Sequence, residues 1–68
     1  MKVLVINGFG KGQIVTTDFV PRVGDKIDMF YEPLPTVSDV VAWPSEARLR
    51  QVKADGFSER IEAIVTAN

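Results

Sequence analysis

The sequence contains no cysteine and no histidine. Without cysteine no disulfide can stabilise the fold, and without either residue a zinc site made of the usual ligands is excluded. The absence of histidine removes the commonest general base, and the absence of cysteine removes the thiol nucleophile. No spacing of acidic residues matches a calcium loop. Asp25 is expected to fix the turn at Gly24 by bonding backbone N–H groups, with Gly24 at positive φ. We therefore expect a protein that is not an enzyme and that binds no cofactor.

The chain also lacks a long apolar run and a strong charge of either sign. Its 68 residues, 46% of them apolar, predict one small globular domain spanning residues 1–68. Eight basic and nine acidic residues leave a net charge of −1, without the basic excess of a dedicated nucleic-acid binder. The apolar run in the opening MKVLVIN is too short for a signal peptide, and no apolar stretch is long enough to span a membrane. A cytoplasmic protein is expected.

Apolar residues alternate with polar ones along much of the chain, which is typical of half-buried strands. Three consecutive β-branched residues within QIVTTDFV disfavour a helix there. The phase of the alternation slips at Asp39, which predicts a bulge. This pattern predicts five strands, over residues 2–6, 13–20, 26–31, 36–43 and 59–67.

The segment SEARLRQVKADG, residues 45–56, has the features of a short helix. Ser45 suits the N-cap, Glu46 suits the first turn, and Gly56 suits the end of a helix. Its apolar face is narrow, with Leu49 and Val52 at its centre. An extended loop or a hairpin arm is the alternative.

Short loops join the early strands, so these must be antiparallel neighbours. The expected fold is mainly β: a small five-stranded antiparallel SH3-like barrel with one short helix before the last strand. Closing the sheet would remove its exposed edges. An open antiparallel sheet with the helix on one face is the second choice. Trp43, the single tryptophan, is expected at the centre of the core.

The stretch VLVINGFGKGQ raises the question of a phosphate-binding turn. Its glycines, at positions 8, 10 and 12, are one residue short of the dinucleotide fingerprint, and a strand rather than a helix follows. Lys11 precedes the last glycine, so the P-loop pattern fails as well. A tight hairpin turn that uses glycine for positive φ is expected.

Apolar side chains on predicted loops indicate a protein-binding surface, because exposed aromatic residues are favoured anchors. Each of them could instead fold back as a lid on the core. Arginines of the predicted helix would lie at the rim. The candidate partner-binding residues are Phe9, Phe30, Tyr31, Leu34, Arg48 and Arg50.

Two other kinds of association remain open. The basic residues Arg48, Arg50, Lys53 and Arg60 could contact phosphates while Trp43 stacks on a base. Acidic residues lie between them, so a solvated mixed-charge face is the alternative. Self-association through an exposed strand edge would give a homodimer.

The segment FVPRVGDKID, Phe19 to Asp28, resembles small SH3-like barrel proteins of phages and prophage-bearing bacteria. In these proteins a Pro-Arg-hydrophobic-Gly-Asp turn precedes a barrel strand. The resemblance covers about ten residues, and the segment FYEPLP and the helix depart from the shortest versions. The resemblance implies a compact barrel and a phage setting, but it carries over no activity and no functional residue. The expected function is a non-enzymatic protein-binding module, a phage accessory protein that binds and modulates a host protein.

Overall fold

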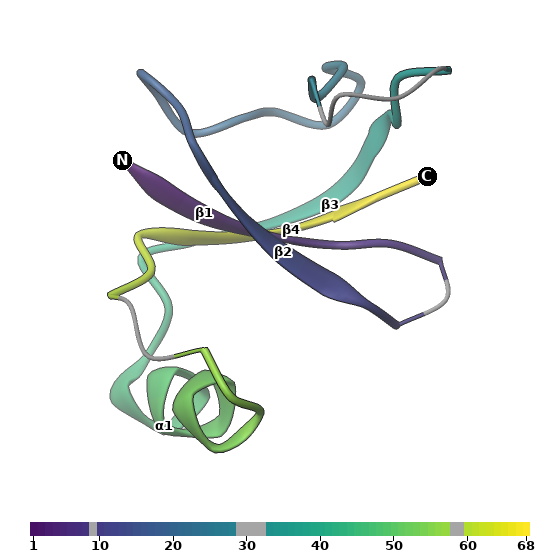
Figure 1. The fold of residues 1–68 in the computed structure, drawn as a ribbon. Coiled ribbons are helices and arrows are strands. Elements are labelled where there is room, and N and C mark those ends of the chain that lie inside the picture. The colour runs from purple at the N-terminus through teal and green to yellow at the C-terminus, as the bar shows by residue number, and fades with distance from the viewer. Residues whose placement is uncertain (9, 29–32, 58–59) are drawn as a thin grey trace.

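A computed structural model describes residues 1–8, 10–28, 33–57 and 60–68. They form one four-stranded sheet and one helix, with strand order β2-β1-β4-β3 (Figure 1). β1 pairs antiparallel with β2 and parallel with β4, and β4 pairs antiparallel with β3. The elements, in chain order, are β1 (Lys2–Ile6), β2 (Gly12–Thr16), β3 (Val37–Ala42), α1 (Glu46–Ala54) and β4 (Ala63–Ala67).

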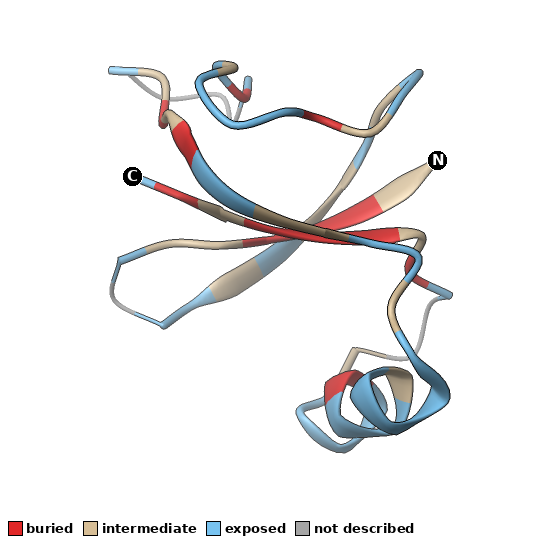
Figure 2. Cartoon of the chain, turned by 180° about the vertical axis from the view of Figure 1, so that it is seen from behind, coloured by how far each residue is buried: buried red, intermediate tan, exposed pale blue. Residues whose placement is uncertain are grey.

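The two central strands are buried on both faces of the sheet (Figure 2). On one face, the described parts of the segment that links β2 to β3, residues 17–28 and 33–36, lie over the strands (Figure 1). Ile27 of this segment packs there, together with Val20. We call this group the loop-side cluster; its buried members are Val3, Val5, Ile27, Val37, Ala63, Val65 and Ala67.

The opposite face is covered by α1 and the chain that follows it. Val52 is the buried residue of the helix, and Leu49 and Phe57 pack beside it. Phe57 lies so close to Gly12 that a Cβ there would be 2.9 Å from the ring, which gives this strand glycine a packing role. We call this group the helix-side cluster; its buried members are Leu4, Val52, Ile61 and Ile64.

The mainly β class and the helix before the last strand are confirmed, but the closed, all-antiparallel barrel is wrong and its five strands are not confirmed. Among the described residues the sheet is open, has four strands and is mixed. β4 inserts between β1 and β3, and its parallel pairing with β1 joins the two ends of the chain. Both strands are nearly continuous apolar runs, which is typical of strands covered on both faces.

Two predicted strands are shorter than expected. The second ends at Thr16 instead of residue 20, because Thr17 Oγ1 donates to the Phe19 carbonyl (2.8 Å) and bends the chain. Of the third, predicted over residues 26–31, the described part forms only an isolated bridge between Lys26 and Thr36. Residues 29–31 lie outside the described residues.

The glycine stretch is the turn of the β1–β2 hairpin, as expected. The Asn7 N–H donates to the Lys11 carbonyl (2.9 Å), and the Gly10 N–H donates to the Asn7 carbonyl (3.0 Å). Gly10 has φ +78°, the left-handed conformation that closes three-residue hairpin loops. Strand follows strand here, so the turn has no helix to direct at a phosphate.

The predicted helix and bulge are both present. The Ser45 hydroxyl accepts the Arg48 N–H (3.2 Å) as the N-cap, and Gly56 ends the helix with φ +102°. The register of β3 against β4 shifts between Val37 and Asp39. No helix in the described ranges is long and apolar enough to cross a membrane.

Trp43 is not the packing centre that the sequence predicts. Its side chain is 67% exposed, and its backbone has φ +53°, a region that favours glycine. The backbone is held there because the Trp43 N–H donates to the Glu62 carbonyl (2.9 Å) just before Pro44 redirects the chain into α1. Aliphatic residues on both faces of β1 and β4 fill the core instead.

Because Trp43 is exposed, its replacement should have little effect on the stability of the fold. We expect Trp43→Ala to lower the free energy of unfolding by less than about 1 kcal/mol, against the roughly 3–5 kcal/mol of a core tryptophan. Trp43→Gly should be at least as stable as Trp43→Ala, because glycine adopts positive φ without strain. Urea unfolding followed by circular dichroism measures both, and a loss near the core value would place Trp43 in the interior.

Candidate functional site

A concave surface lies at the end of β2, on the side of the loop-side cluster. Beyond Thr16 the chain leaves the sheet and crosses its face, and Pro21 is buried in this crossing. Phe19 lies between the bend at Thr17 and this proline, and its side chain is 69% exposed. The local sequence thus holds an aromatic ring in solvent next to the core.

The turn Arg22–Asp25 shapes the far wall of this surface. The Asp25 N–H donates to the Arg22 carbonyl (2.9 Å), and the Asp25 carboxylate accepts the Arg22 N–H (2.9 Å). Gly24, with φ +93°, supplies the positive φ that a type II turn needs at its third position. The sequence-based interpretation of Asp25 as the residue that fixes the Gly24 turn is confirmed.

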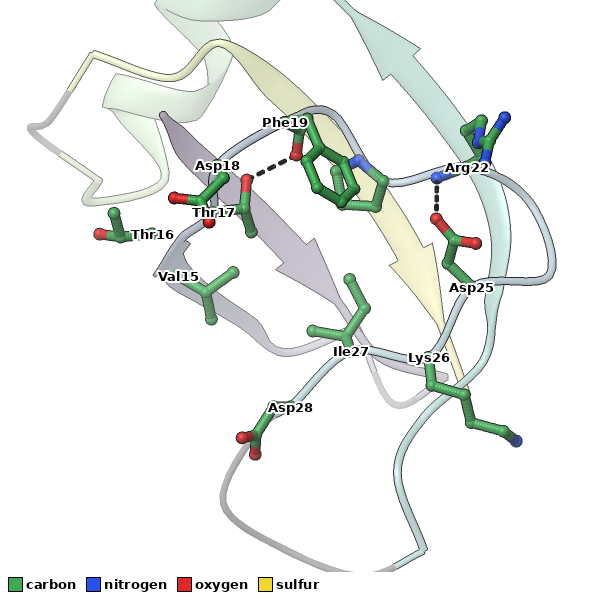
Figure 3. Close-up of a pocket in the computed structure, with 11 residues that line it drawn as sticks. Val15, Thr16, Thr17, Asp18, Phe19, Arg22, Asp25, Lys26, Ile27 and Asp28 are labelled. Atoms are coloured by element: carbon green, nitrogen blue, oxygen red, sulfur yellow. Dashed lines mark hydrogen bonds between the residues drawn. The ribbon is translucent and has the colours of Figure 1, made fainter.

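Residues 24–27 are then tied to the start of β3. The Gly24 N–H donates to the Val37 carbonyl (2.9 Å), and the Val37 N–H donates to the Asp25 carbonyl (2.8 Å). The Ile27 N–H donates to the Pro35 carbonyl (3.0 Å). These bonds position Ile27 opposite Val15 of β2 across the concave surface (Figure 3).

The result is a solvent-open pocket of about 470 Å³ between β2 and residues 25–28 (Figure 3). This volume is within the range of ligand pockets. Val15, Pro21 and Ile27 supply apolar lining, and Phe19 forms a wall. The charged lining residues are Asp18, Arg22, Asp25, Lys26 and Asp28.

Two of the charged groups are committed to the fold. The Lys26 ammonium donates to the Thr36 hydroxyl (2.9 Å), and the Asp25 carboxylate holds the turn. In Figure 3 the Lys26 side chain extends away from Ile27. Asp18 lies at the opposite rim, next to Thr17. No group of three acidic residues close enough to hold a metal ion occurs in the described part of the chain.

The predicted partner-binding residues are not brought together where they can be placed. Leu34 is half-buried in the segment over one face of the sheet, whereas Arg48 and Arg50 are exposed on α1 at the other face. The two arginines are two residues apart, so they project from different sides of the helix. Phe9, Phe30 and Tyr31 lie outside the described residues.

Phe19 and the pocket beside it were missed by sequence reasoning, which assigned Phe19 to a strand face. The signal was present in Pro21, because a strand that continued to Val20 would run directly into a proline. An aromatic residue two positions before a proline, at a strand end, is well placed to lie on the bend. The closure of the pocket by residues 25–28 depends on the backbone hydrogen bonds of Gly24 and Asp25 to Val37 of β3, which no local pattern shows.

Comparison with known proteins gives no relative: no family model, curated protein or solved structure matches this chain.

The turn is open to a direct test. We expect Gly24→Ala to lower the free energy of unfolding by about 1–2 kcal/mol, because a Cβ disfavours the left-handed backbone. No atom lies within 4 Å of the added Cβ, so the effect isolates backbone conformation from crowding. Val23→Ala, at an exposed neighbouring position, is the control and should change stability by less than about 0.5 kcal/mol. Equal urea midpoints for Gly24→Ala and the parent protein would contradict the assigned turn.

Proposed function

We propose that this protein is a non-enzymatic protein-binding module that receives an apolar side chain of its partner in the pocket beside Phe19. The observation that carries the proposal is the 69% exposure of Phe19 at the wall of a pocket whose lining combines apolar residues, Val15, Pro21 and Ile27, with charged ones. A large aromatic ring kept in solvent beside the apolar residues of a concave surface is the arrangement of a binding anchor.

The chemistry of the pocket supports a peptide rather than a reactive substrate. The chain has no histidine or cysteine, and the Asp25 carboxylate is engaged in the turn. Asp18 remains at the rim beside Thr17, where a basic neighbour of the anchoring side chain would be favoured. The expected ligand is therefore a segment with an apolar residue followed or preceded by lysine or arginine.

The resemblance of Phe19–Asp28 to small phage and prophage proteins supports a host protein as the partner. This resemblance falls on the same segment that builds the pocket, from the Phe19 wall to the Arg22–Asp25 turn. We therefore infer a phage accessory protein that modulates the host protein it binds.

Phe19→Ala tests the pocket. Peptides selected from a random library on the immobilised parent protein should share an apolar residue next to a basic one. Their affinity should fall about 30-fold in Phe19→Ala, the loss typical of a hot-spot residue. Val23→Ala is the matched control, because Val23 is equally exposed (68%) but does not line the pocket. Unchanged affinity in Phe19→Ala, or an equal loss in Val23→Ala, would remove the pocket as the binding site.

A second candidate function, nucleic-acid binding, is favoured by one specific observation. Trp43 is 67% exposed immediately before α1, which carries Arg48, Arg50 and Lys53 on its surface. An exposed ring beside basic residues can stack on an unpaired base. The net charge of −1 opposes this function, because phosphate contacts supply most of the affinity in such complexes.

A gel shift separates the two functions. The protein-binding proposal predicts no shift of single- or double-stranded DNA or RNA at about 50 mM salt, where phosphate contacts are strongest. A shift that is lost in Trp43→Ala but kept in Phe19→Ala would establish the second function. The opposite dependence would assign nucleic-acid binding to the pocket and contradict both proposals.

A further inference from the structure

The outer edge of β2 carries backbone hydrogen-bonding groups that no described residue of the chain pairs with. In the hairpin, Met1 and Thr17 exchange two bonds (2.5 and 2.9 Å), and the Asn7 N–H donates to the Lys11 carbonyl (2.9 Å). Bonded and non-bonded pairs alternate in an antiparallel ladder, so the backbone groups of Gly12, Ile14 and Thr16 point away from β1. None of the described residues pairs with β2 on that side.

The two edges of the sheet are protected unequally. At the β3 edge, Val37 is bonded on its outer side to Gly24 and Asp25, a bulge follows, and Asp39 adds a charge. All three features discourage pairing with another chain. β2 reads Gly-Gln-Ile-Val-Thr, without a charge or a proline, and its pairing with β1 runs without a register shift.

We propose that two copies of this chain pair through the outer edges of β2 to form one continuous sheet. In antiparallel orientation with Ile14 on the two-fold axis, Ile14 faces Ile14 of the second copy and Gly12 faces Thr16. Each of these pairs exchanges two hydrogen bonds, and the register uses all three outward residues. The strand is therefore self-complementary, as a two-fold interface requires.

Side chains favour the same register. The half-buried Ile14 belongs to the helix-side cluster, so the Ile14 pair extends apolar packing across the interface. Lys11 precedes β2 and Asp18 follows it, so antiparallel pairing brings the basic end of one strand toward the acidic end of the other. Parallel pairing would place like charges at each end.

Sedimentation equilibrium of the full chain up to about 1 mM detects even a weak dimer. We expect twice the 7.5 kDa chain mass at high concentration. Thr16→Pro removes an outward N–H without touching a β1–β2 bond and should give a folded monomer, verified by its amide NMR spectrum. Thr16→Ala keeps the N–H and, as the matched control, should still dimerise.

A disulfide tests the register independently, because the chain has no other cysteine. Facing residues of a bonded antiparallel pair are about 5.5 Å apart at Cα, within disulfide reach. Under mild oxidation, Ile14→Cys should crosslink rapidly as a dimer, whereas Ser38→Cys, exposed on the β3 edge, should crosslink slowly. Equal rates would overturn the proposed interface.

Three other outcomes would also overturn the proposal. They are a monomer at every concentration, a dimer that survives in Thr16→Pro, and a Thr16 amide protected from exchange only when a selected peptide is bound. The last outcome would assign the β2 edge to a partner strand instead of a second copy.

Discussion

The parallel pairing of β1 with β4 is the constraint on which the rest of the structure depends. It joins residues 3–6 to residues 63–66 and places two apolar strands at the centre of the sheet, where both faces must be covered. One face is covered by α1 and the other by residues 17–28 and 33–36. Because a chain of this size forms a thin core, each covering segment is needed to bury the sheet. The pocket forms within the segment that covers the loop-side cluster, and its exposed walls are therefore built on residues that stabilise the fold.

Local sequence patterns predicted the local features of the structure. Period-two alternation located β1, β2, β3 and β4 in outline, and the Ser45 cap and Gly56 bounded α1 to within about two residues. The turns at Gly10 and Gly24 could be predicted because few residues other than glycine adopt a positive φ. The order of the strands could not be predicted, because the pairing of β1 with β4 spans most of the chain. Trp43 shows the same limit: its size suggests a core residue, but its backbone is set by a distant bond to Glu62.

The candidate site was only partly predictable for a related reason. The role of Asp25 followed from its place in the turn, whereas the exposure of Phe19 follows from where β2 stops. Thr17 and Pro21 end that strand, and the long-range bonds of residues 24–27 to β3 decide what lies opposite. The surface proposed from sequence combined Leu34 with Arg48 and Arg50, which the sheet separates onto opposite faces. Exposure alone predicts a patch poorly when the strand order is unknown.

The proposed dimer determines how the helices and the pockets of the two copies would lie relative to each other. A two-fold axis perpendicular to a continuous sheet keeps like faces together, so both helices would lie on one side and both pockets on the other. In the proposed register Gly12, which has no side chain, would face Thr16, which lines the pocket. Two pockets on one surface bind a partner that repeats its motif, or is itself a dimer, more tightly than one pocket does, because the second contact is intramolecular. An unprotected strand edge in so small a protein is thus consistent with partner binding, because dimerisation through this edge would provide two pockets without a larger hydrophobic core.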